Sequence, residues 1–182
     1  TNQYCHGTLG AYPSRSSTLL LYDYNKYFYS LFHFGQLENT NPGLLFRTKI
    51  SRDTNSNFKI TDKSILIDSL ETTEGIQAIR HGNGRDWWII MHESSSNNFI
   101  KYLFTPIGIL GPYKQAIGNT WTHQYWTAQS AFSPDGNWYA LVSEYNGANL
   151  FRFDRCTGLL SDYISLNKPA DDNRYYPRGV CF

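Results

Sequence analysis

The sequence lacks a surplus of charge of either sign. Sixteen lysine and arginine residues stand against fifteen aspartate and glutamate residues, so the formal net charge is +1 at pH 7. The chain also lacks a basic cluster that could neutralise a run of phosphates. The sequence therefore predicts no nucleic-acid partner.

Long hydrophobic runs are also missing. No segment approaches the roughly twenty apolar residues needed to cross a bilayer, so we expect no membrane span. Residues 1–4 show no basic stretch followed by the apolar core of a signal peptide. Only 17% of the residues are charged, so the surface must use amides, hydroxyls and aromatic rings. This composition favours a secreted protein.

Cysteine is scarce. The three cysteines, Cys5, Cys156 and Cys181, do not have the spacing of a metal site, and an odd number leaves at least one unpaired within the chain. Buried free thiols are one interpretation. A disulfide between Cys5 and one of the other two is the alternative, and it requires an oxidising compartment.

The motifs of common catalytic sites are absent as well. The sequence contains no Gly-x-Ser-x-Gly elbow, phosphate-binding glycine loop, HExxH motif or EF-hand. His92 and Glu93 do not begin a zinc-protease motif, because the second histidine is missing. We therefore expect no cofactor and no metal, and no residue is assigned a catalytic role.

The residues that are present predict an all-β protein. Hydrophobic residues make up 41% of the chain and aromatic residues 16%, which is typical of a packed globular domain. Short β-branched and aromatic runs alternate with Gly, Asn, Asp and Pro, and no stretch has a sustained helical period. We expect strands at 18–24, 27–34, 44–50, 64–67, 76–80, 87–92, 98–104, 130–132, 138–143, 149–154 and 179–182.

The second half of the chain repeats itself. Segments 79–109 and 132–159 have the same order of turn, paired aromatics, polar loop and second strand. Trp87 and Trp138 are 51 residues apart, Glu93 and Glu144 are also 51 apart, and Phe132 and Phe182 are 50 apart. A fixed period of this size, with several strands in each copy, is typical of the blades of a β-propeller.

We therefore expect a β-propeller of four-stranded antiparallel blades, with about three blades and the start of a fourth. The predicted blades are 16–70, 74–121 and 126–167, and the next begins at 178–182. A closed propeller has about four to eight blades. The rest of the propeller is expected from the same longer chain, and an assembly partner is the alternative source.

The repeated stretches resemble a known group of proteins. GIQAIRHGNGRDWWIIMHE at 75–93 and FSPDGNWYALVSE at 132–144 are similar to blades of secreted propellers from Bacteroidota-type bacteria, which are related to the WD40 and YVTN-like repeats. The resemblance covers 64–182, although the blade ends lack Trp-Asp. It implies a seven-bladed or similar propeller, export to the cell surface or medium through type IX secretion or gliding-motility machinery, and usually no enzymatic activity.

Two groups of residues are candidates for a site. His81, His92 and Glu93 could ligate a metal or exchange a proton, but strand alternation places His92 and Glu93 on opposite faces, which favours a structural role. Side chains that could contact a ligand or partner are the aromatic-rich loop between blades and one arginine beside a possible central channel. These residues are Trp121, His123, Tyr125, Trp126 and Arg85, and the channel could also include Glu74, Arg80 and Asp86.

The sequence leaves three functions open. We expect a non-catalytic binding or scaffold propeller at the cell surface or in the medium, whose blade loops engage a protein or a glycan. A propeller enzyme of the lactonase or metal-dependent hydrolase type is the second hypothesis. The third is a structural subunit of a large extracellular assembly.

Overall fold

The computed structural model describes residues 18–22, 27–35, 43–70, 72, 75–121, 128–143, 146–166 and 179–182. These residues form strands and turns and contain no helix, so the all-β prediction is confirmed. The strands are β1 Thr18–Tyr22, β2 Phe28–Gly35, β3 Gly43–Arg52, β4 Phe58–Leu70, β5 Gln77–Arg80, β6 Trp87–His92, β7 Asn98–Thr105, β8 Gly108–Ala116, β9 Ala128–Phe132, β10 Trp138–Ser143, β11 Gly147–Asp154 and β12 Leu159–Leu166.

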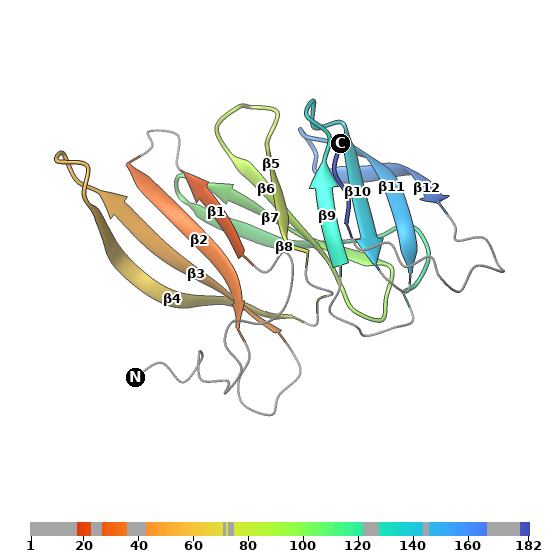
Figure 1. Ribbon diagram of the computed structural model, residues 1–182, viewed down its shortest axis with the longest axis horizontal. Helices are drawn as coiled ribbons and strands as arrows, with labels where there is room; N and C mark the ends of the chain where they lie inside the picture. The colour runs from red at the N-terminus through yellow and green to blue at the C-terminus, as the bar shows by residue number, and fades with distance from the viewer. Residues whose placement is uncertain are drawn as a thin grey trace. The chain divides into compact units, whose positions relative to one another are not determined.

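The strands form three sheets of four consecutive antiparallel strands each (Figure 1). We call β1–β4 sheet 1, β5–β8 sheet 2 and β9–β12 sheet 3. The chain divides into two compact units: sheet 1 belongs to the first, and sheets 2 and 3 belong to the second. The predicted repetition of four-stranded units is therefore present at the level of the sheets.

The strand predictions need correction at four places. Strands β8 and β12 were not expected, and the expected strand at 64–67 is only part of the 13-residue β4. Residues 179–182 were expected to form a strand but have no regular secondary structure. Strands β8 and β12 were missed because they are largely exposed and because Gly, Pro, Ser and Asp interrupt their apolar residues, so neither has the continuous apolar run that identifies a buried strand.

In the first unit, a side-chain carboxylate closes the hairpin between β3 and β4. Asp53 Oδ1 accepts hydrogen bonds from the backbone N–H groups of Asn55 at 2.9 Å and Asn57 at 2.8 Å. Aspartate is favoured in such turns because its short side chain satisfies backbone donors that the ladder leaves open. Ser56 then takes a positive φ of 67°, and the chain reverses into β4.

Sheets 2 and 3 share one hydrophobic core. Trp88, Ile90 and Phe99 of sheet 2 pack with residues of sheet 3, and many of the contacts are between aromatic rings. Phe99 lies 5.0 Å from Phe151 and 5.9 Å from Tyr139 between ring centroids, both edge to face, an arrangement that aromatic pairs prefer. The core also contains Trp121, Ala128, Leu141, Phe153 and Leu160.

The strand pairing gives the true correspondence between the two sheets. In sheet 2, Arg80 pairs with Trp87 and the turn contains Gly84 at φ 71°; in sheet 3, Phe132 pairs with Tyr139 and the turn contains Gly136 at φ 73°. Every member of the second hairpin lies 52 residues after its counterpart. The sequence comparison had matched Trp87 with Trp138, which is wrong by one position, because it followed residue type rather than backbone pairing.

This one-residue difference decides which faces meet. Neighbouring residues of a strand point to opposite sides, so Tyr139 and Leu141 correspond to Trp87 and Ile89, not to Trp88 and Ile90. In the shared core, sheet 2 contributes the face that carries Trp88 and Ile90, and sheet 3 contributes the face that carries Tyr139 and Leu141. The two sheets use opposite faces in their shared seam, so they are related head to tail.

The first strands of sheets 2 and 3, β5 and β9, repeat the same relation. Strand β9 lies beside β5, where Gln77 Nε2 donates to the Ser130 carbonyl at 3.1 Å and Ser130 Oγ donates to the Gly75 carbonyl at 2.7 Å. Gln129, which is 52 residues after Gln77, donates from Nε2 to the Val180 carbonyl at 3.5 Å. Residues 179–182 thus lie against β9 much as β9 lies against β5.

Candidate functional site

Four hairpin turns of the second unit gather at one end. In an up-and-down sheet of four strands, the first and third turns share an end. The two sheets are aligned there, because the Gly82 N–H donates to the Arg155 carbonyl at 2.9 Å. We call this end the turn face; it consists of 81–86, 105–108, 133–137 and 154–159.

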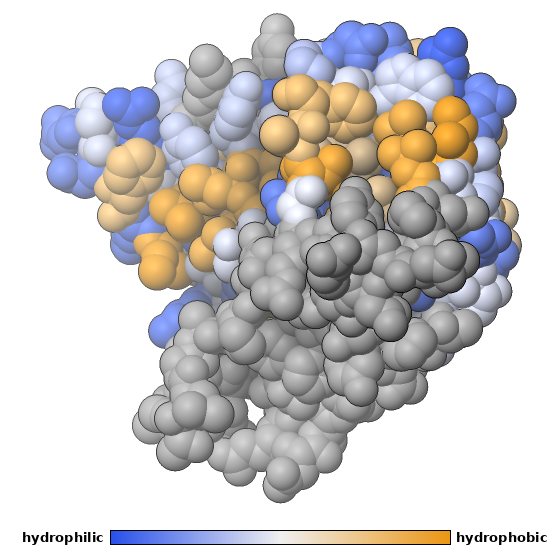
Figure 2. Space-filling view, turned by 45° about the vertical axis from the view of Figure 1, so that its right-hand side comes forward, coloured by the Kyte–Doolittle hydropathy of each residue, from blue (hydrophilic) through white to orange (hydrophobic). Residues whose placement is uncertain are grey.

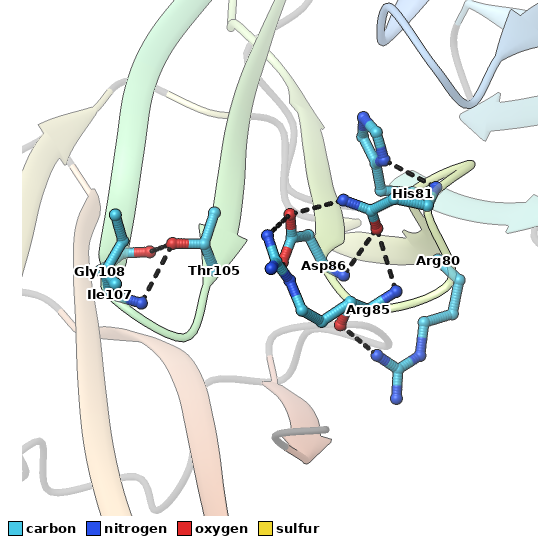
Figure 3. A network of polar contacts seen from close by, with 8 residues as sticks. Arg80, His81, Arg85, Asp86, Thr105, Ile107 and Gly108 are labelled. Carbon is cyan, nitrogen blue, oxygen red and sulfur yellow. Dashed lines mark hydrogen bonds and ion pairs between the residues drawn. The ribbon is translucent and has the colours of Figure 1, made fainter. Parts of the chain in front are cut away.

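A buried carboxylate organises the first turn. Asp86 is 4% exposed and accepts hydrogen bonds from Arg85 Nε at 2.8 Å, Arg85 Nη2 at 3.1 Å and Asn83 Nδ2 at 2.8 Å. Asn83 Oδ1 accepts from the backbone N–H groups of both Arg85 and Asp86. The hydrogen bonds from Arg85 hold the pKa of Asp86 below its ordinary value. Figure 3 shows this network.

Two guanidinium groups are fixed by these contacts. The Arg85 side chain is 53% exposed although one edge is bound to Asp86. Arg80 donates from Nη1 to the Arg85 carbonyl (Figure 3), and its guanidinium lies 4.0 Å from the centre of the Trp87 ring. Because both side chains are already ordered, little rotamer entropy remains to be lost when a partner binds.

The turn between β7 and β8 carries an exposed apolar side chain. Ile107 is 92% exposed. Its backbone N–H donates to Thr105 Oγ1 at 3.3 Å, and Thr105 Oγ1 donates to the Gly108 carbonyl at 3.0 Å (Figure 3). The backbone is thus held from within the turn, while the Ile107 side chain projects into solvent.

The two turns of sheet 3 are ordered in the same way. Asp135 Oδ1 accepts from the Asn137 N–H at 3.0 Å, and Asp154 Oδ1 accepts from the Cys156 N–H at 2.8 Å. The pKa of Asp135 is lowered mainly by the hydrogen bond from Ser133, and that of Asp154 mainly by the bond from the Cys156 N–H. The backbone of all four turns is therefore held by hydrogen bonds from within each turn.

The structure does not bring His81, His92 and Glu93 together. His81 Nδ1 accepts from the Asn83 N–H at 2.9 Å, so its Nε2 carries the proton and donates to the Cys156 carbonyl at 3.0 Å. The ring ties sheet 2 to sheet 3. His81 precedes β6, whereas His92 is its last residue and Glu93 follows it, so the length of the strand separates His81 from the other two.

His92 lies inside the aromatic core and is 2% exposed. Its ring centroid is 4.8 Å from Phe99 and 4.4 Å from Trp121. Burial lowers the pKa of His92 to about 4, because an imidazolium is poorly solvated in such surroundings. At neutral pH the ring is uncharged and acts as a core side chain.

Glu93 is bound by its neighbours rather than turned toward the histidines. Its Oε1 pairs with Lys114 Nζ at 2.6 Å, and its Oε2 accepts from Asn98 Nδ2 at 2.6 Å. Partial burial acts to raise the pKa of Glu93, but the hydrogen bonds from Lys114 and Asn98 outweigh it and keep the pKa low. Within the described ranges, no three His, Cys, Asp or Glu residues are grouped as a metal would require.

The predicted aromatic loop can be followed only at its first residue. Trp121 is 4% exposed, its N–H donates to the Ser96 carbonyl at 2.9 Å, and its ring packs on His92. Trp121 is therefore part of the hydrophobic core, and its side chain is not exposed for the partner contact that the sequence predicted. His123, Tyr125, Trp126 and Glu74 lie outside the described residues.

Sequence reasoning missed a buried cation. Lys101 is 3% exposed in β7 and donates from Nζ to Gln115 Oε1 at 2.6 Å and to the Gly158 carbonyl at 2.5 Å. Gln115 in turn bonds both backbone groups of Leu160, at 2.7 and 3.0 Å. Burial lowers the pKa of Lys101 to about 8. The one available signal was a lysine inside the apolar run NFIKYLF.

Comparisons with known proteins add no assignment to this geometry. The part of the chain that the structure describes contains no helix of the length and apolarity that a membrane crossing needs. No protein-family model, no curated protein and no solved structure matches the chain.

Proposed function

We propose that this chain is a non-catalytic binding module whose sheets are blades of a β-propeller, and that it holds a protein partner on the turn face. The observation that carries the proposal is that two neighbouring preformed turns of one sheet expose an arginine and a large apolar side chain. Arg85 is held by Asp86 and its side chain is 53% exposed, and Ile107 is 92% exposed. Arginine and large apolar side chains are typical anchors of protein interfaces. The composition supports a location at the cell surface or in the medium.

The seam between sheets 2 and 3 supports the propeller arrangement. Blades that fan around an axis must each contact one neighbour with one face and the next neighbour with the other. Sheets 2 and 3 meet in this head-to-tail manner, and their innermost strands β5 and β9 are adjacent. In a sandwich of two equivalent sheets, both sheets would instead contribute the same face to the seam.

A protein partner fits the turn face better than a glycan does. Sugar rings stack on exposed aromatic side chains. The exposed large aromatic residues of the described ranges are Tyr27, Phe28, Phe58, Tyr113 and Phe182, and none of them belongs to the four turns. The turn face instead combines polar amides and carboxylates with Arg85, the adjacent Arg80 and the exposed apolar side chains of Ile107 and Leu159, which suits a peptide surface.

The test is a selection of displayed random peptides against the purified chain, with a glycan array in parallel. We expect peptides whose affinity falls about tenfold on Ile107→Ser, since loss of an anchor removes about 1.4 kcal/mol or more. Arg85→Ala should weaken binding similarly. Ile107→Ser is the decisive variant, because Arg85→Ala leaves the buried Asp86 without its cation and can reduce stability.

The matched control is Ile60→Ser on β4, where the side chain is 55% exposed in the other unit. Peptides that bind Ile107→Ser and Ile60→Ser as well as the parent chain would refute the turn face as the binding surface. Binding to glycans alone would refute a protein partner.

A further inference from the structure

The outer face of sheet 3 is the side turned away from sheet 2. Its residues alternate with the core residues along each strand and meet across the ladder: Ala140 pairs with Leu150 and Leu150 with Ile164, while Val142 pairs with Ala148 and Ala148 with Leu166. We call these six residues the outer face. All six are apolar.

This face has a counterpart that is already engaged elsewhere in the molecule. The 52-residue correspondence matches Ala140 and Val142 with Trp88 and Ile90, which sheet 2 buries in its seam with sheet 3. The outer face is therefore the equivalent of a known contact surface. Head-to-tail contact predicts that it receives another sheet.

The outer face is covered on one side and open on the other. Toward β9, Ala140 and Val142 are 6% and 3% exposed, and residues 179–182 lie beside Gln129 of that strand. On β12, Ile164 and Leu166 are 42% and 56% exposed. Apolar residues also gather in patches on the side of the molecule shown in Figure 2. This increase in exposure from β10 to β12 is expected if a covering sheet contributes only the segment that lies beside β9.

We propose that the outer face docks a further four-stranded antiparallel sheet of the same polypeptide, with residues 179–182 as its innermost segment. This inference rests on the proposed propeller arrangement. One contact and one correspondence carry it. Gln129 donates to the Val180 carbonyl as Gln77 donates to the Ser130 carbonyl. The outer face corresponds to the Trp88 side of sheet 2, which another four-stranded sheet buries.

The composition of the outer face defines what the covering sheet must bring. Ala140 stands where sheet 2 has Trp88, and Ala148, the pairing partner of Val142, stands where sheet 2 has Lys101. At these two positions sheet 3 thus has smaller side chains in place of a tryptophan and a buried lysine. The covering sheet must fill this space with larger apolar side chains, and the seam needs no buried polar acceptor opposite Ala148.

Cysteine labelling of the natural full-length protein tests the proposal. Leu166→Cys is compared with Ile60→Cys, a residue of equal exposure here on β4 (56% and 55%), after Cys5, Cys156 and Cys181 are replaced by serine. We expect a neutral maleimide to label position 166 about tenfold more slowly than position 60 or slower still, since a covered thiol reacts only when the seam opens. A second pair, Ile164→Cys and Phe28→Cys on β2, repeats the comparison at exposures of 42% and 41%.

Equal labelling rates at positions 166 and 60 would overturn the proposal. Protection that appears only at high protein concentration would also overturn it, because a second copy would then cover the face. The peptide-binding test of the turn face is independent: Ile107→Ser weakens peptide binding about tenfold without changing these labelling rates, so the failure of one proposal is distinguishable from the failure of the other.

Discussion

Replacing Lys101 with methionine should remove an unusual rise of stability with pH. The ammonium group is buried between sheets 2 and 3, where its acceptors are the Gln115 amide oxygen and the Gly158 carbonyl oxygen. Burial depresses its pKa in the folded protein from 10.5 to about 8. Between these values the unfolded chain still holds the proton that the folded chain has lost.

The sign and size follow from proton linkage. Because the unfolded state binds more protons in this window, the free energy of unfolding increases as pH rises from 8 toward 10.5. The full shift corresponds to about 3 kcal/mol. Most of this increase in the free energy of unfolding, about 2 kcal/mol, should appear between about pH 7.5 and 9.5.

Urea unfolding followed by tryptophan fluorescence at several pH values gives the measurement. Trp88 lies in the same seam, where its Nε1 donates to the Arg155 carbonyl at 3.0 Å, so its emission reports opening of this contact. The comparison is the difference between the parent chain and Lys101→Met, which cancels groups common to both. Lys59→Met, in the other unit, controls for the loss of one positive charge.

A parent chain whose stability is flat or falling relative to Lys101→Met across this window would refute the reasoning. So would an equal pH dependence in both proteins. Either result would mean that Lys101 remains hydrated or finds a compensating anion. The expected result is a slope that disappears in Lys101→Met and persists in Lys59→Met.

Three further outcomes are expected. Gly158→Ala should destabilise the protein by about 2 kcal/mol more than Gly84→Ala in chemical denaturation, because both glycines have φ 71° but only a Cβ at 158 would approach the Trp88 ring, at 2.7 Å. His92→Asn should abolish a loss of about 3 kcal/mol that the parent chain shows as pH falls from 6.5 to about 4, the range between the unfolded and folded pKa values of His92; unfolding curves at successive pH values measure it. The lowered pKa of Asp86 contributes stability above pH 3.8 that is lost as the carboxylate is protonated, so acid unfolding monitored by circular dichroism should depend less on pH in Asp86→Asn.

The sequence predicted the inner strands of each sheet better than the outer ones. Strands β6 and β10 are buried on both faces and appear as continuous apolar runs. Strands β8 and β12 are largely exposed, so their pattern is close to that of a loop. The alternation rule was right, but the reference point was one residue off, since a tryptophan match is weaker evidence than a shared turn.

The site was harder to predict because its hydrogen bonds join residues that are far apart in the sequence. Gln115 binds Leu160, 45 residues away, and His81 binds Cys156, 75 residues away. No local pattern signals such contacts. Ile107 was also missed, since an apolar residue in a Thr-Pro-Ile-Gly turn carries no sign of whether it folds inward or projects.

The head-to-tail seam makes this fold directional. In the proposed propeller, each sheet gives one side to its predecessor and the other to its successor, as sheets 2 and 3 do at their seam; whole units of 52 residues could then be duplicated or deleted while each junction still joins complementary surfaces. A shift of a single residue within a strand has the opposite effect, because it turns the sheet inside out. Such a protein can change in length by complete repeats far more readily than by fractions of one.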